Sequence, residues 1–123
     1  MLFRSNQEIE GTTIEKYFDR NIRIKQCMIR KIPKYLEKYS SLAYYEVPKL
    51  DSSGGAFYLS NKVNKKSEIL SLSLHENVPG HHYQYSIAIR NNVPKYRIWN
   101  SWISFTEGWA TYVENLGFYN ELS

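Results

Sequence analysis

The sequence predicts a mainly α fold with one short β strand at an edge of the structure. Three long segments place apolar residues at spacings of three and four, as amphipathic helices do. One short segment, AFYLS, is rich in aromatic residues and follows two glycines, as a strand does. The chain has 123 residues, of which 42% are hydrophobic and 23% charged, so we expect one domain over residues 1–123.

The composition excludes some classes of protein, and the net charge suggests a further class to consider. No apolar run approaches the ~20 residues that cross a membrane, and the N-terminus lacks the apolar stretch of a signal peptide. We therefore expect no membrane segment, and the compartment stays open. The single cysteine excludes an internal disulfide framework. The net charge of +4 and eleven tyrosines raise single-stranded nucleic acid as a partner. However, the basic residues of 20–38 interleave with apolar ones, as on the solvated side of a helix, so we expect no nucleic acid.

The N-terminal third is predicted to be helical, over residues 12–40. A first helix over about 12–30 is indicated by the spacing of Ile14, Phe18, Ile22 and Ile29. Pro33 ends this helix or begins a short second one. A connector rich in turn residues follows, and residues 54–60, GGAFYLS, form the predicted edge strand.

Residues 67–91 admit two interpretations. The alternation of Leu70, Leu72 and Leu74 favours a strand, whereas Ser67 as an N-cap favours a helix. We prefer the helix, because a strand would point His75 and Glu76 to opposite faces. A Pro-Gly break at 79–80 interrupts this helix.

The last predicted helix spans residues 98–117 and has two unlike sides. Gly117 is expected to cap its end, and Gly108, Ala110 and Thr111 are expected to let another helix approach closely. The aromatic side carries Trp102, Phe105, Trp109, Tyr112 and Leu116. The small-residue side carries Gly108, Ala110 and Thr111.

The chemistry lies in HENVPGHH, residues 75–82, which contains all three histidines of the chain. The segment begins like the zinc-protease motif HExxH, but Pro79 stands where the second histidine belongs. Zinc in a hydrolase takes three protein ligands and keeps one position for water. We expect one Zn²⁺, with His75 as a ligand, Glu76 as general base, and Glu107 from the later helix as the third ligand. An exposed, unliganded Glu107 is the alternative, and Glu114 could orient a ligand histidine.

The second histidine ligand is either His81 or His82. In a regular helix neither works, because the residues would lie about 9 Å and about 10.5 Å along the axis from His75. If Pro79 and Gly80 bulge outward, His81 takes the ligand position. His82 then points into the cleft as a catalytic group that donates a hydrogen bond to a substrate carbonyl.

Three segments resemble one family, the domain of unknown function 885 (DUF885) proteins, regarded as gluzincin-type zinc metallopeptidases. They are HENVPGHH (75–82), EGWATYVE (107–114) and GGAFYLS (54–60), in the family's order and spacing. The resemblance covers roughly the last three quarters of the chain. It implies a partial gluzincin-like metallopeptidase core, with zinc held by the motif histidines and Glu107, and Glu76 as base. Family members run to several hundred residues, so the chain is expected to be a fragment or a degenerate copy.

The expected function is therefore zinc-dependent peptide hydrolysis by a metal-activated water. The peptide substrate is expected to pair with the edge strand at Ala56, Phe57 and Tyr58, as extended peptides add to open sheets. A short strand without a ligand explains that segment equally well. The alternative function is a noncatalytic metal-binding or protein-interaction remnant that keeps the site but lacks its cleft. Oligomeric state and cleavage specificity stay open.

Overall fold

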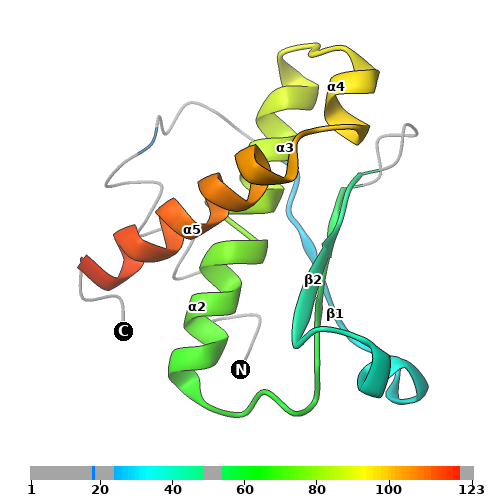
Figure 1. Cartoon of the computed structure of the whole chain (residues 1–123), viewed down its shortest axis with the longest axis vertical. Coiled ribbons are helices and arrows are strands. Elements are labelled where there is room, and N and C mark those ends of the chain that lie inside the picture. The colour runs from blue at the N-terminus through cyan, green and yellow to red at the C-terminus, as the bar shows by residue number, and fades with distance from the viewer. Residues whose placement is uncertain (1–17, 19–23, 49–53, 120–123) are drawn as a thin grey trace.

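The computed structural model describes residues 18, 24–48 and 54–119. Helices make up most of this part of the chain, and three short strands form one mixed sheet beside them (Figure 1). The elements in chain order are β1 (Met28–Lys31), the 3₁₀ helix η1 (Lys34–Tyr39), β2 (Ala43–Glu46), β3 (Ala56–Leu59), α2 (Lys66–Glu76), α3 (His81–Arg90), α4 (Lys95–Trp99) and α5 (Ile103–Tyr119).

The sheet has the strand order β1-β3-β2, so β3 is its central strand. β1 runs parallel to β3, and β2 runs antiparallel to it. Phe57 stands opposite Ile29 on one side and opposite Tyr45 on the other. The predicted strand is present, but its expected edge position is wrong. The central position of β3 is explained by burial, because Phe57 is 0% exposed and a strand with buried side chains belongs inside a sheet.

The helix predicted to extend to about residue 30 is wrong over its described part. Residues 24–27 have no regular structure, and Met28–Lys31 form β1. The backbone finds its hydrogen-bond partners on β3, since Met28 N donates to the Gly55 carbonyl at 3.1 Å and Ile32 N to the Leu59 carbonyl at 2.9 Å. Most earlier positions of that helix lie outside the described residues. The short second helix after Pro33 is present as η1.

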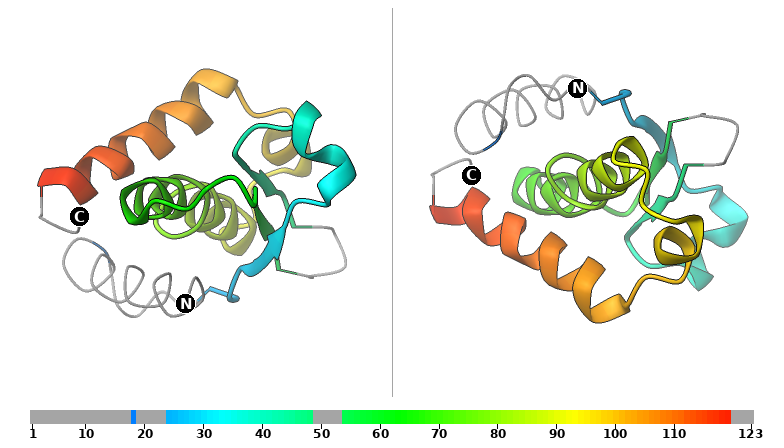
Figure 2. Two further views of the ribbon diagram at one scale, coloured as in Figure 1. Left: turned by 90° about the horizontal axis from the view of Figure 1, so that it is seen from below. Right: turned by 90° about the horizontal axis from the view of Figure 1, so that it is seen from above.

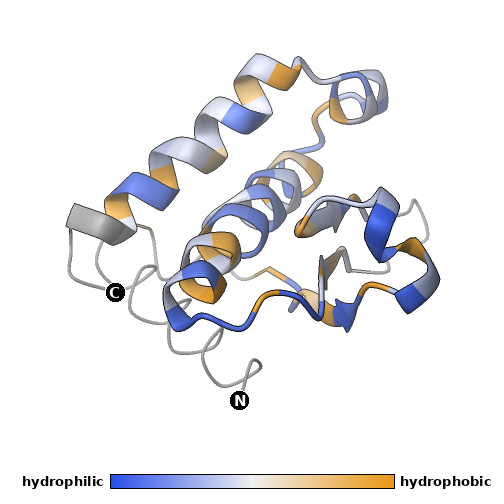
Figure 3. Ribbon diagram, turned by 60° about the horizontal axis from the view of Figure 1, so that its bottom comes forward, coloured by the Kyte–Doolittle hydropathy of each residue, from blue (hydrophilic) through white to orange (hydrophobic). Residues whose placement is uncertain are grey.

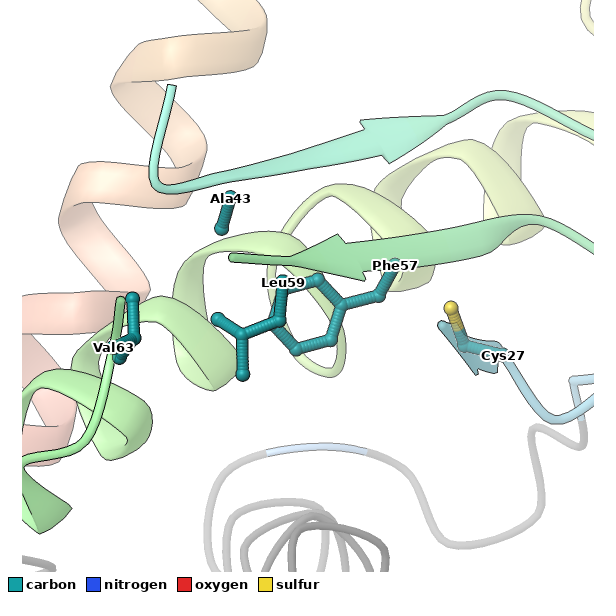
Figure 4. Packing of buried hydrophobic residues seen from close by; sticks show 5 residues of the cluster. All are labelled: Cys27, Ala43, Phe57, Leu59 and Val63. Atoms are coloured by element: carbon teal, nitrogen blue, oxygen red, sulfur yellow. The ribbon is translucent and has the colours of Figure 1, made fainter. Parts of the chain in front are cut away.

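The apolar core lies between the sheet and α2. Alternate residues of a strand share one face, and Figure 4 shows this for Phe57 and Leu59, which lie with three further buried residues. From the helix, Ile69 and Leu72 pack against this cluster. The buried cluster comprises Cys27, Ala43, Phe57, Leu59 and Val63. The core therefore anchors α2, and with it the histidine segment, to the sheet.

The other side of α2 packs against α5. Figure 2 views α2 and α3 nearly end-on, with α5 along one side and the sheet on another. Ala110 and Val113 are both 0% exposed. Gly117 lies inside α5 rather than at its end, and a Cβ there would come within 2.2 Å of Leu74 Cδ1. The predicted C-cap at Gly117 is therefore wrong, because this glycine provides space for Leu74.

The predicted close approach of another helix is present at Ala110, which is 0% exposed where α5 packs against α2, but not at Gly108. Gly108 is exposed, and a Cβ added there would meet nothing within 4 Å. The predicted helix over 98–117 is divided, since α4 ends at Trp99 and α5 begins at Ile103. On the aromatic side of α5, Phe105 and Tyr112 are exposed, whereas Trp109 is half-buried. Figure 3 shows hydrophobic and hydrophilic residues alternating along α5, as expected for a helix with one buried side and one exposed side.

Among the described residues, no helix is both long and apolar enough to cross a membrane.

Candidate metal site

The turn between α2 and α3 replaces the regular helix that would have separated the histidines. α2 ends at Glu76 and α3 begins at His81, and the Val78–Pro79 peptide is cis. Gly80 passes close to the end of α2, where a Cβ would lie 1.8 Å from the His75 carbonyl oxygen. The requirement for glycine is therefore steric, since its φ of −74° is open to other residues.

Trp109 of α5 ties this turn to the neighbouring helix. Its indole Nε1–H donates a hydrogen bond of 2.7 Å to the carbonyl oxygen of Pro79. The same ring lies 6.1 Å from Phe18 and 5.8 Å from Tyr112, measured between centroids. Because Glu107 lies two residues before Trp109, this contact also sets the position of Glu107 relative to the histidines.

His75, His81 and Glu107 converge at the junction of α2, α3 and α5. His75 Nε2 lies 3.0 Å from Glu107 Oε2, and His81 Nε2 lies 3.1 Å from Glu107 Oε1. The two imidazole rings meet edge to face, with 4.9 Å between their centroids. One carboxylate thus faces two imidazole nitrogens that come from opposite sides of the Pro-Gly turn.

Glu114 lies about two helical turns after Glu107 on α5 and contacts the other ring nitrogen of His75. Its Oε2 is 3.1 Å from His75 Nδ1, and its Oε1 accepts a hydrogen bond from the hydroxyl of Ser71. A neutral imidazole has only one N–H, yet both nitrogens of His75 face carboxylate oxygens. The arrangement is satisfied by one more positive charge at His75, either a second proton or a metal cation at Nε2.

The geometry and chemistry of this group fit zinc. His75, His81 and Glu107 each offer one ligand atom, and these atoms lie within 4.8 Å of one another. Ligand atoms around a tetrahedral zinc lie about 3.3 Å apart, and each histidine nitrogen lies at a similar distance from one of the two Glu107 oxygens. The side chain of Glu107 is 51% exposed, so solvent reaches the group from this side. Two imidazoles and one carboxylate are a ligand set found in zinc hydrolases.

Glu76 is buried directly beside this group. It is 7% exposed. Burial raises the pKa of Glu76 to about 7, and the negative charges of Glu107 and Glu114 act in the same direction, against a lowering by His75. Burial also lowers the pKa of His81, which favours the neutral imidazole that binds metals.

His82 does not occupy the position that the sequence suggested. It is 1% exposed, with Nδ1 at 2.8 Å from the Tyr45 hydroxyl and Nε2 at 2.6 Å from the Lys25 carbonyl oxygen. Both ring nitrogens are engaged within the protein, so the predicted hydrogen bond to a substrate carbonyl has no donor. Successive helix residues point about 100° apart, which explains why His81 and His82 reach different environments.

The strand predicted to bind substrate has no free edge. β3 pairs along Ala56–Leu59 with β1 on one side and β2 on the other. The side chain of Phe57 is buried, and the Tyr58 hydroxyl donates to Glu46 Oε2 at 3.2 Å. Strand addition at Ala56, Phe57 and Tyr58 is therefore a wrong prediction, because their backbone groups are already paired.

Tyr45 and Ser71 contact the site residues and were not anticipated from the sequence. Tyr45 belongs to β2, in a segment interpreted as a connector. The β-forming run AYYEV was the available signal for this strand. Ser71 lies four residues before His75 on α2, so the helical spacing itself could have suggested that it shares a face with this histidine.

Comparison with known proteins assigns the chain to a family. Residues 3–121 match DUF885, described as a bacterial protein of unknown function. The chain belongs to the DUF885 family. The resemblance seen in the motifs is thus confirmed, and the match extends over nearly the whole sequence.

One solved structure supports the fold. The crystal structure titled "the putative lipoprotein from Colwellia psychrerythraea" matches with a TM-score of 0.81 and 23% sequence identity. The match covers 95% of this chain and 20% of that chain. This chain thus spans about a fifth of the length of the similar protein. No curated protein matches the chain.

Proposed function

We propose that this DUF885 chain carries the centre of a zinc-dependent peptide hydrolase, with one zinc ion held by His75, His81 and Glu107. The observation that carries the proposal is the convergence of these three side chains, whose ligand atoms lie within 4.8 Å of one another. The buried carboxyl of Glu76 next to His75 adds the acid–base group that such a reaction needs.

Each residue has a distinct role in this proposal. When bound, zinc supplies a Lewis acid that activates water and polarises a carbonyl group. Glu76 accepts a proton from the attacking water and passes it to the leaving amine. Glu114 accepts a hydrogen bond from His75 Nδ1 and thereby fixes the orientation of the ring. Solvent and substrate approach from the exposed side of Glu107.

The edge strand β2 offers a peptide substrate an open outer edge beside the site. β2 pairs with β3 and with no other strand among the described residues. Its residue Tyr45 lies 6.3 Å from the His81 ring, between centroids. An extended peptide that adds to the outer edge of β2 would therefore run past the histidines. This replaces β3 as the proposed substrate strand.

The test compares zinc content and peptide hydrolysis in three proteins. We expect about one zinc per wild-type chain, none in Glu107→Ala, and full zinc in Glu76→Gln. Hydrolysis of a mixture of fluorogenic peptides should fall about a hundredfold or more in Glu76→Gln, the size of a general-base contribution. Zinc is measured by elemental analysis after gel filtration, and hydrolysis by fluorescence.

Glu68→Gln is the matched control, because Glu68 lies on the same helix and is exposed in its first turn. It should keep both zinc and hydrolysis. Full zinc in Glu107→Ala would contradict the ligand assignment. Stoichiometric zinc with no hydrolysis by the wild type would instead support a noncatalytic metal-binding protein.

A further inference from the structure

The two histidines proposed as ligands are supported in different ways. His75 has Glu114 at its Nδ1, at 3.1 Å. His81 Nδ1 is buried and has no hydrogen-bond partner among the described residues. Metal-binding histidines usually donate their second ring N–H to a carboxylate, a carbonyl or water, which sets the ring orientation. The orientation of His81 must therefore come from the packing around it and from the backbone that carries it.

The backbone at His81 is fastened by its neighbour His82. The Lys25 carbonyl oxygen can only accept a hydrogen bond, so the His82 Nε2 at 2.6 Å carries the proton. His82 Nδ1 is then an acceptor, and the Tyr45 hydroxyl at 2.8 Å donates to it. Burial lowers the pKa of His82, which agrees with this neutral form, and raises that of Tyr45, which keeps its hydroxyl proton.

Tyr45 also packs against the His81 ring itself. The rings of Tyr45 and His81 are nearly parallel, with an interplanar angle of 25° and 6.3 Å between centroids. The tip of the Tyr45 side chain occupies the space above Gly55, where an added Cβ would lie 1.9 Å from the hydroxyl oxygen. Gly55 thus makes room for the hydroxyl that reaches His82.

We propose that Tyr45 is a positioning residue for the metal site, holding His81 toward Glu107 through its hydrogen bond to His82 and its contact with the His81 ring. The inference rests on the proposed function only in that His81 is a zinc ligand. It adds a residue from the sheet to a site that is otherwise built from three helices. It also assigns a purpose to His82, whose two nitrogens connect β2 with the chain before β1.

The experiment measures zinc affinity by chelator competition in Tyr45→Phe, which removes only the hydroxyl. We expect an affinity about tenfold lower than that of the wild type, the smaller end of the range for residues that orient ligands. Tyr44→Phe is the matched control, because Tyr44 lies beside Tyr45 on β2 and stacks on Tyr58 at the opposite face of the sheet. Its affinity should stay within about twofold of wild type, since Tyr44 contacts no histidine.

A second variant and a spectrum separate positioning from general stability. Gly55→Ala should lower zinc affinity in the same direction, because the added methyl group displaces the Tyr45 hydroxyl. The absorption spectrum of bound Co²⁺ should change in Tyr45→Phe, because the His81 ligand is reoriented. In the metal-free wild type, nitrogen NMR should find the His82 proton on Nε2, and Tyr45→Phe should shift the Nδ1 signal.

Unchanged zinc affinity and an unchanged Co²⁺ spectrum in Tyr45→Phe, with only a lower melting temperature, would overturn the positioning role. A proton on His82 Nδ1 in the wild type would overturn it as well, as would a wild type that binds no zinc. Weakened zinc binding in Tyr45→Phe together with no hydrolysis by the wild type would sustain the inference and contradict the peptidase function.

Discussion

His81 and His82 are adjacent in the chain, yet they belong to two unlike regions of the molecule. His81 faces α5, where Glu107 and Glu114 both contact His75. His82 faces the sheet, where it joins Tyr45 of β2 to the backbone of Lys25. The first region is open to solvent through Glu107, and the second is closed.

The two regions satisfy their polar groups differently. On the sheet side, each nitrogen of His82 has one protein partner of matching type, so nothing further is required. On the α5 side, His75 has acceptors at both nitrogens, while His81 has a buried nitrogen without a partner. A fully paired histidine stabilises a fold, whereas a cluster with surplus acceptors is suited to a cation.

The turn that separates the two regions should be the most sensitive point. Gly80→Ala would bring a Cβ to within 1.8 Å of the His75 carbonyl oxygen, so α2 and α3 have to move apart. We expect a loss of about 3 kcal/mol or more in the free energy of unfolding, together with loss of zinc binding. Urea unfolding of the metal-free protein and zinc titration measure the two effects.

Gly108→Ala is the control for that substitution, since nothing lies within 4 Å of an added Cβ there. Alanine at this exposed helical position should raise stability by up to about 1 kcal/mol. Equal behaviour of the two variants would mean that the turn is not held as tightly as the contacts indicate.

Substitution of the adjacent histidines should give opposite patterns. His81→Ala should abolish zinc binding and lower metal-free stability less than His82→Ala does, because its Nδ1 has no partner to lose and its Nε2 contacts only the half-exposed Glu107. His82→Ala should cost about 2 to 4 kcal/mol in the metal-free protein, since it opens a cavity and removes the hydrogen bonds of His82 with the Lys25 carbonyl and the Tyr45 hydroxyl. It should also weaken zinc about tenfold, through Tyr45 and the backbone.

Calorimetry without metal and zinc titration together measure this pair. A His82→Ala protein that loses zinc completely, beside a His81→Ala protein that retains it, would reverse the assignment of the ligand.

The smallest effect is expected at Trp109. Trp109→Phe keeps an aromatic ring beside Phe18 and Tyr112 but removes the N–H that donates to the Pro79 carbonyl. The free energy of unfolding should fall by about 1 kcal/mol, the net contribution of one hydrogen bond. Chemical unfolding in the absence of metal provides the value. Tyr112→Phe, which loses only an exposed hydroxyl, should be indistinguishable from wild type.

The sequence by itself determined the features that depend on local chemistry. Pro79 and Gly80 predicted an interruption of the helix, because proline lacks the N–H that a helix interior uses. The types and order of His75, Glu76, His81 and Glu107 suggested a zinc site before any fold was known. The family motifs also follow from the order of residues, and the DUF885 match agrees with them.

Only the tertiary structure decided which groups face one another. The position of β3 in the sheet depends on β1 and β2, whose pairing joins residues far apart in sequence. Met28–Lys31 could satisfy its backbone in a helix or in a sheet, and the edge of β3 selects the strand. The different surroundings of His81 and His82 arise in the same way. Helical spacing makes the two side chains point in different directions. The packing of α5 and of the sheet then determines which groups each side chain contacts.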